Sequence, residues 1–168
     1  MISALTARIT EADRQFIGQH LLPGEAALFW QMNLPDQRHA LNVAYTALEL
    51  AAQERGINQD LLLKCALLHD VGKVKGDVST ADKIITVILD KIAPDWVRKW
   101  GRSGRGGKIA NLRHAVHTYY HHAARGAAML SAAGVAAEIT GIVARHHEAP
   151  ADGEPPELRL LRTADSLN

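Results

Sequence analysis

The sequence predicts an all-α protein that folds as a single helical bundle. Only 5% of its 168 residues are aromatic, alanine is abundant and 47% of residues are hydrophobic, a composition typical of packed helices. Apolar residues recur every three or four positions over most of the chain, whereas the alternating pattern of a half-buried strand is nearly absent. A chain of this length can bury a core within one domain.

Capping and stop signals place the individual helices. Thr10 begins a short helix through a capping signal, and Pro23 begins a second. Asp36 caps a long helix that runs to about Arg55, and Gly56 ends it. The remaining predicted helices are about 58–72, ended by Gly72; 79–93, broken by Pro94; 114–133; 135–147; and a last helix that carries Leu158 to Leu167.

The chain shows neither an internal repeat nor a shift in composition that would mark a second domain. We therefore expect residues 1–168 to form one domain. Residues 36–168 are predicted to be its core, and residues 1–35 an N-terminal helical extension.

The net charge indicates no particular class of binding partner, and the cysteine content does not indicate an extracellular protein. The formal net charge is +1, and the single cysteine, Cys65, is predicted to be a small buried apolar residue rather than half of a disulfide. No run approaches the ~18 apolar residues of a membrane span. The N-terminus lacks the apolar core of a signal peptide. The prediction is a cytoplasmic protein without a membrane span.

His69 and Asp70 stand side by side at the end of a predicted apolar helix. Adjacent helical residues point about 100° apart, so they rarely share one packing role, but at a helix end they can bind a metal ion from two directions. Other predicted helices also carry imidazoles or carboxylates on apolar faces. An unpaired buried carboxylate costs several kcal/mol, and a shared divalent cation removes that cost. These further candidates are His39, His122, His146, His147 and Asp165.

A second group of histidines offers an alternative ligand set on the predicted helix 114–133. Its spacing at i, i+3 and i+4 could hold a metal on one helix face, but that face carries no carboxylate. We prefer His122 because Gly126 and Met129 mark its side of the helix as the packed one. The competing set is His114, His117 and His121.

The candidate ligands resemble, in their order, the metal signature of the HD-domain phosphohydrolase superfamily, over about residues 36–168. The segment from His122 to Ala127 is similar to the family's His-Pro-x-x-Gly-Ala segment, with Ala123 in place of the proline. The segment from Ile142 to Glu148 resembles the Ile-x-x-His-His-Glu segment of the two-metal members.

The resemblance implies an HD-domain bundle with a central site for one or two divalent ions, which can be Fe, Mn, Zn, Ni, Co or Mg. Asp70 would bridge the ions, and His147 would coordinate one or orient the attacking water, so both are catalytic candidates. Lys73 corresponds to a lysine that contacts substrate phosphate in the His-Asp-x-Gly-Lys subgroup; its other interpretation is a solvated lysine at a helix end. The implied first metal site is His39, His69, Asp70 and Asp165, and the second adds His122 and His146.

Two departures from the family pattern narrow the prediction. Pro35 stands where three-metal members carry a glutamate, so we do not expect a third ion. The Gly-Tyr-Pro segment of cyclic dinucleotide phosphodiesterases does not follow Glu148, which argues against cyclic-di-GMP as the substrate.

A basic segment follows Asp95, and no acidic residue occurs before Glu138. Its glycine-rich part, residues 101–107, cannot hold regular structure at reasonable cost. Three interpretations remain open: a solvated loop, a lid over the metal site, and a nucleic-acid contact. The last is the weakest, because aromatic interleaving is limited to Trp96 and Trp100, which we expect to pack in the core. In the lid interpretation of residues 97–113, the substrate would contact Arg102, Arg105 and Lys108.

The sequence therefore predicts a metal-dependent phosphohydrolase that cleaves a phosphomonoester or phosphodiester, of nucleotide type, by a metal-activated hydroxide. Two alternatives stay open: a module that senses a nucleotide without turnover, and a di-iron oxygenase built on the same fold. The expected partner is a phosphorylated small molecule, without a strong nucleic-acid signal. Neither the oligomeric state nor the identity of the substrate follows from the sequence.

Overall fold

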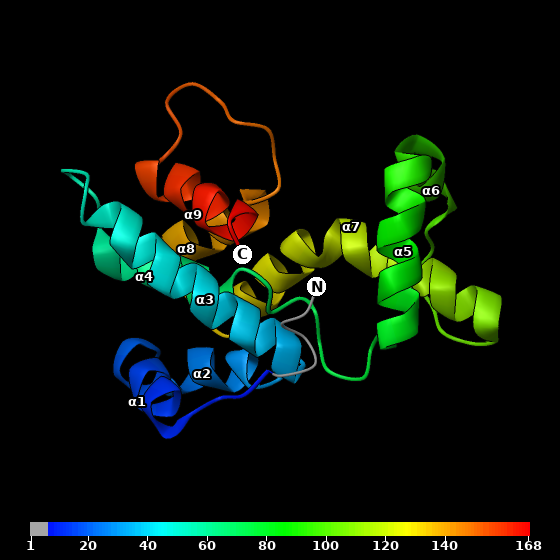
Figure 1. Cartoon of the computed structure of the whole chain (residues 1–168), viewed down its shortest axis with the longest axis horizontal. Coiled ribbons are helices and arrows are strands. Elements are labelled where there is room, and N and C mark those ends of the chain that lie inside the picture. Colours follow the sequence, from blue (N-terminus) through cyan, green and yellow to red (C-terminus); the bar gives the residue numbers. More distant parts are fainter. Residues whose placement is uncertain (1–6) are drawn as a thin grey trace.

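The all-α prediction is confirmed for residues 7–168, the part of the chain that this computed structural model describes (Figure 1). An isolated bridge between Met32 and Val74 is the one β-type pairing in that part. Residues 1–6, part of the stretch judged to lack a signal peptide, lie outside it. The nine helices are α1 (Glu11–His20), α2 (Pro23–Phe29), α3 (Leu34–Ala51), α4 (Gln59–Leu68), α5 (Thr80–Ile92), α6 (Pro94–Trp100), α7 (Lys108–Ala132), α8 (Ala137–Arg145) and α9 (Pro156–Ser166).

Helices α1 to α4, α8, α9 and the second half of α7 form the body of the molecule. Helix α3 packs on both α4 and α9, and α4 also contacts α8. Small side chains on one stripe of α3 allow this close packing, because they let neighbouring backbones approach. Cys65 is buried in the same core, as predicted. The stripe on α3 consists of Ala40, Ala44, Ala47 and Ala51, all buried.

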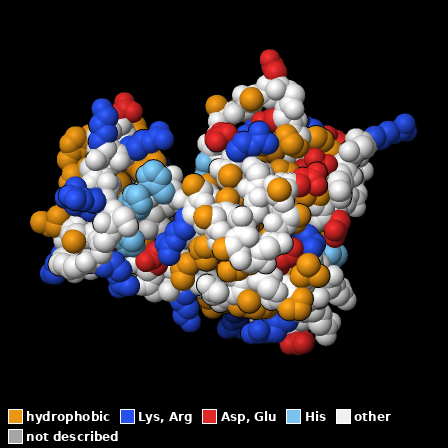
Figure 2. Space-filling view, turned by 180° about the vertical axis from the view of Figure 1, so that it is seen from behind, with side chains coloured by type: hydrophobic (Ala, Val, Ile, Leu, Met, Phe, Trp, Pro, Cys, Tyr) orange, Lys and Arg blue, Asp and Glu red, His pale blue; other side chains and the backbone are white. Residues whose placement is uncertain are grey.

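Helices α5, α6 and the first half of α7 form an arm that projects from the body (Figure 1). Helix α7 belongs to both parts, since its 25 residues extend over about 37 Å. Figure 2 shows body and arm as two masses with a cleft between them. Trp96 stacks on Trp100 in this arm and remains 58% exposed, so the expectation that it packs in the core is wrong.

Several helix boundaries differ from the sequence prediction. Helix α3 begins at Leu34 after the cap residue Asn33, not at Asp36, and it ends at Ala51, before Arg55. Helix α7 begins at Lys108 rather than near residue 114, directly after the irregular segment 101–107. Pro94 does not only break α5, because it is also the first residue of α6, a position where its missing N–H costs nothing. Within residues 7–168, no helix combines the length and apolarity that crossing a membrane requires.

Gly72 does not end helix α4, as the sequence suggested, because α4 already ends at Leu68. Instead it brings the turn after Asp70 against the backbone of α7. A Cβ atom on Gly72 would lie 2.1 Å from the carbonyl oxygen of His122 and 2.9 Å from the amide nitrogen of Gly126. Only a residue without a side chain allows this approach.

The substitution Gly72→Ala is expected to lower the free energy of unfolding by about 1–3 kcal/mol, because the backbone of α7 must move to admit the methyl group. Denaturant unfolding measures the change. The matched control is Gly18→Ala in α1, where nothing lies within 4 Å of the added Cβ, and it should leave stability equal or raise it. Equal stability of both variants would show that the contact has no energetic weight.

A buried carboxylate in α1 fixes the start of α3. Asp13 accepts hydrogen bonds from Thr10, from Arg38 at 3.0 Å and from the hydroxyl of Tyr45 at 3.0 Å. Burial alone would raise the pKa of Asp13, but these hydrogen bonds and the charge of Arg38 outweigh it and lower the pKa. The network holds α3 on both sides of His39.

Because the pKa of Asp13 is lower in the folded state, its ionised form stabilises the fold above the unfolded pKa of about 3.9. That contribution is lost as the pH falls through the folded pKa. Asp13→Asn should therefore be less stable than the parent at neutral pH, with a gap in melting temperature that narrows below pH about 4. Glu11→Gln, at an exposed carboxylate of the same turn, is the control. A gap that stays constant down to acid pH would contradict the assignment.

Candidate metal centre

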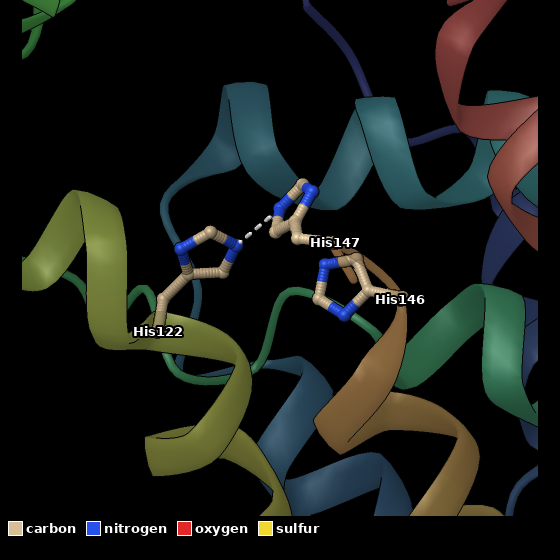
Figure 3. A group of neighbouring side chains, drawn as sticks. All are labelled: His122, His146 and His147. Carbon is tan, nitrogen blue, oxygen red and sulfur yellow. Dashed lines mark hydrogen bonds between the residues drawn. The ribbon is translucent and has the colours of Figure 1, made fainter. Parts of the chain in front are cut away.

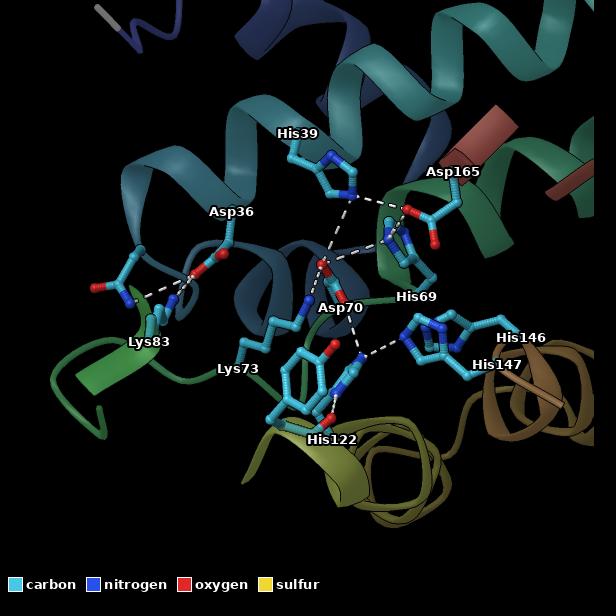
Figure 4. A network of polar contacts seen from close by, with 12 residues as sticks. Asp36, His39, His69, Asp70, Lys73, Lys83, His122, His146, His147 and Asp165 are labelled. Atoms are coloured by element: carbon cyan, nitrogen blue, oxygen red, sulfur yellow. Dashed lines mark hydrogen bonds and ion pairs between the residues drawn. The ribbon is translucent and has the colours of Figure 1, made fainter. Parts of the chain in front are cut away.

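Imidazole and carboxylate groups from five helices meet where the body faces the arm (Figure 4). Helix α3 supplies one histidine, the end of α4 a His-Asp pair, α7 one histidine, the end of α8 two histidines, and α9 one aspartate. Every residue that the sequence analysis proposed as a metal ligand lies in this cluster. They are His39, His69, Asp70, His122, His146, His147 and Asp165.

Helix geometry sets the protonation of three of these histidines. The ring Nδ1 atoms of His69, His122 and His146 lie 2.7–2.8 Å from the carbonyl oxygens three residues earlier in the chain. A carbonyl oxygen only accepts, so each Nδ1 must carry the proton and donate it. Each Nε2 atom is then left with a lone pair, the form in which an imidazole binds a metal ion.

The free lone pairs are buried and face one another. The Nε2 atoms of His69 and His146 have no hydrogen-bonding partner among residues 7–168, and neither has Oδ1 of Asp70. Nε2 of His122 lies 3.3 Å from Oδ1 of Asp70, but neither atom brings a proton to the contact. Buried polar atoms without partners are costly. A cation at their centre would satisfy them all, so the residues present fit a metal.

The first half of the cluster surrounds Oδ2 of Asp70. Oδ1 of Asp165 lies 2.9 Å from Nε2 of His39 and 3.6 Å from Nε2 of His69. Oδ2 of Asp70 lies 3.5 Å from Nε2 of His69. Ligands bound at about 2.1 Å from one ion are spaced about 3.0–3.4 Å apart, so only a small contraction is needed.

The second half of the cluster is a group of three histidines, one of which, His122, lies 3.3 Å from Oδ1 of Asp70. His122, His146 and His147 each place a ring nitrogen within 4.8 Å of the others (Figure 3). Nε2 of His147 lies 2.9 Å from Nε2 of His122, and since Nδ1 of His122 holds its proton, His147 donates in this contact. Asp70 thus offers one oxygen to each half, the arrangement of a carboxylate that bridges two ions.

The surroundings of the cluster favour, at neutral pH, the protonation states that bind a metal ion: neutral imidazole and ionised carboxylate. Burial lowers the pKa of His146 to about 3, helped by His69 and His147, and lowers that of His147 to about 4, helped by His122. Burial would raise the pKa of Asp165, but the opposing effects, led by the hydrogen bond with His39, bring the pKa to about 2. The imidazoles of α8 are therefore neutral and the carboxylate of α9 is ionised.

Lys73 provides the positive charge nearest to Asp70. Its ammonium group donates to Oδ2 of Asp70 at 2.7 Å. Burial would raise the pKa of Asp70, but the opposing effects, led by the charge of Lys73, hold the pKa well below its usual range. Lys73 and a metal ion would share the same carboxylate oxygen.

A polar cavity of about 540 Å³ opens beside the cluster, between body and arm. Lys73, His122 and His147 form its inner wall, and Arg98 of α6 stands on the arm side. Arg98 belongs to the basic segment that follows Asp95, but the sequence did not indicate that it lies at the site. Further polar lining residues that the sequence did not indicate are Asp90, Tyr119, Tyr120 and Glu148; both tyrosine hydroxyls donate to Asp90.

Tyr119 could have been found from helical spacing, because it precedes His122 by three residues and so lies on the same face of α7. Asp90 and Arg98 could not, since their helices reach the site only through long-range packing on α7.

The structure does not bring the predicted lid residues to the cluster. Arg105 donates to the carbonyl oxygen of Gly76, Arg102 lies beside Arg113, and Lys108 is the exposed first residue of α7. In the described chain none of the three lines the polar cavity. The competing histidines also lie apart, with His114 bonded to Asp77 at 3.0 Å.

Comparison of the sequence with models of known protein families shows which family this chain belongs to. The family model for the HD domain matches residues 37–168. The chain belongs to the HD domain family. Neither the curated proteins nor the solved structures that were compared include a match to this chain. The HD domain family is one of metal-dependent hydrolases, and the His/Asp clusters of this HD domain are groups that could hold a metal ion.

Asp70→Ala is expected to abolish retention of the metal, because both halves of the cluster lose the carboxylate that they share. Elemental analysis of the purified variant and parent measures the ions per chain. His121→Ala is the matched control, since His121 is an exposed histidine of α7 outside the cluster, and it should retain the parent's metal content. An Asp70→Ala protein with the parent's metal content would disprove the site.

Proposed function

We propose that this HD domain is a metal-dependent phosphohydrolase that cleaves a phosphomonoester or phosphodiester of nucleotide type. The observation that carries the proposal is the pair of ligand clusters joined by Asp70 and opening into a polar cavity with cationic walls. One or two divalent ions would supply an activated water at neutral pH and neutralise charge on the phosphoryl group.

The residues of the chain then position the substrate. Lys73 and Arg98 line the same cavity and can bind phosphoryl oxygens, which lie within reach of the cluster at its inner wall. The carboxylate of Asp90 accepts from both tyrosines, and Glu148 is a second acidic residue of the lining. Lys73 and Arg98 balance these two carboxylates, and the divalent ions held by the cluster would make the cavity favour a negatively charged ligand.

His147 is suited to handle the proton of the attacking water. It is the exposed member of the cluster, it lines the polar cavity, and its pKa of about 4 keeps it neutral at physiological pH. A neutral imidazole beside the cavity can accept a proton or orient a water molecule. Phosphoryl transfer requires positioning and charge stabilisation more than a covalent nucleophile.

The two alternative functions receive less support. A sensing module without turnover has no need to keep a complete set of ligand atoms in metal-ready protonation, yet His69, His122 and His146 all have it. An oxygenase has no general need for two cations beside the metal site, and this cavity has Lys73 and Arg98. Oxygen consumption with iron and without phosphate release would favour the oxygenase.

The proposal is tested with purified protein loaded with each candidate ion and a panel of phosphate mono- and diesters, measuring released phosphate or nucleoside. Lys73→Ala is expected to raise KM about 10- to 100-fold with a smaller effect on kcat, because a charge-assisted hydrogen bond to the substrate is lost. Lys91→Ala, at an exposed lysine of α5, is the control and should retain both constants. Absence of turnover with every ion and ester would disprove the proposed function.

A further inference from the structure

A second, apolar cavity lies beside the polar one and shares two of its residues. Its volume is about 160 Å³, and Lys73 and Tyr119 line both cavities. The turn after Lys73 forms one wall, α5 the second and α7 the third. The ammonium group that would hold a phosphate therefore also stands at the entrance to an apolar space.

The lining of this apolar cavity suits an uncharged ring with a few polar atoms. Most of its exposed lining is hydrocarbon. The charged groups on its walls are already paired: Asp36 with Lys83 at 2.6 Å, Asp77 with His114 and Arg125, and Lys73 with Asp70. The remaining polar groups are two threonines and the hydroxyl of Tyr119. Ligand sites typically combine apolar walls with a few such groups. The apolar wall residues are Val74, Val78, Val87 and Ala115.

One buried hydroxyl on the wall lacks a partner. Thr86 is 1% exposed, and its Oγ1 atom has no hydrogen-bonding partner among residues 7–168. It is the one buried residue of α5, on the side that meets α7. An unsatisfied buried hydroxyl costs about 1–3 kcal/mol, so its presence at a cavity wall points to a ligand atom that would complete it.

The cavity is open to solvent rather than a void in the core. Val87 is 40% exposed and Tyr119 is 36% exposed, and they stand on opposite sides of it, on α5 and α7. A ligand can therefore enter from the cleft between body and arm that Figure 2 shows. An apolar cavity of about 150 Å³ can bind one benzene molecule, so a volume of about 160 Å³ suits a single ring.

We propose that the apolar cavity binds a single-ring heteroaromatic group of the substrate, as in a pyrimidine base, while the phosphate stays in the polar cavity. This inference rests on the proposed function and names the class of ester. The ring packs against Val87 and Ala115, one of its polar atoms bonds to Thr86, and Lys73 separates the ring from the reacting phosphate.

The direct test makes the apolar cavity smaller by enlarging a side chain on either of two opposite walls. Ala115→Leu and Val87→Phe each fill part of it, and Ala128→Leu makes the first change at an exposed position of the same helix. We expect both filling variants to lower kcat/KM for cytidine and uridine monophosphates at least about tenfold, and to leave that for glycerol phosphate unchanged. The Ala128→Leu protein should behave as the parent. Equal loss for all esters, or no loss for any, would overturn the proposal.

A second variant separates ligand binding from folding. Thr86→Val keeps the shape of the side chain and removes the hydroxyl, so the free protein should be as stable as the parent or more stable. Its affinity for cytidine monophosphate, measured by calorimetric titration of the metal-free protein, should fall about tenfold. Unchanged affinity, or parent protein that binds adenosine and cytidine monophosphates equally, would overturn the cavity assignment.

The titration also keeps this inference apart from the proposed function. If no ester is hydrolysed with any ion, the proposed function fails, while selective binding of pyrimidine nucleotides still supports the cavity. If esters are hydrolysed without preference for a single ring and the filling variants change nothing, the cavity assignment fails alone.

Discussion

The buried carboxylate of Asp70 is the constraint on which the rest of the structure depends. An ionised carboxylate that is 1% exposed cannot persist without positive charge and hydrogen-bond donors around it. Lys73 supplies one charge, to Oδ2 only. Oδ1 lies 3.3 Å from Nε2 of His122 and has no hydrogen-bond donor among the described residues, so a cation in the cluster would satisfy it. The requirement explains why five separate helices direct ligand groups to one point.

Two helix ends deliver those groups by the same local device. His69 follows the last residue of α4 and His146 follows the last residue of α8, and each ring turns back to the carbonyl three residues earlier. That bond fixes ring orientation and tautomer together, the task that outer hydrogen bonds perform in metal sites. The residue after each histidine, Asp70 or His147, then adds a second side chain to the cluster. A His-Asp or His-His pair at a helix end is thus one structural unit.

The sequence was sufficient for the parts of the site that local pattern determines. Helical spacing put His39, His122 and Asp165 on inward faces, and helix-end position singled out His69 and Asp70. It misread Gly72, because a close approach to α7 cannot be told from a helix stop without the partner. It could not place residues 101–107 relative to the cluster either, because the early start of α7 at Lys108 carries that loop away from it.

The arm would allow a metal centre that can act on many phosphate esters to select a narrow range of them. All of the clustered ligands lie in the body or on the shared helix α7, whereas Arg98 and Thr86 lie on α6 and α5. Helix α5 turns Thr86 and Asp90 toward the cleft and leaves most of its isoleucines exposed, so its inner face is the polar one. A helix that folded only to bury apolar surface would have the opposite orientation. The inward polar face is therefore better explained by contact with a ligand in the cleft than by core packing, which agrees with the proposal that the arm contributes to the choice of ester while the body holds the metal ligands.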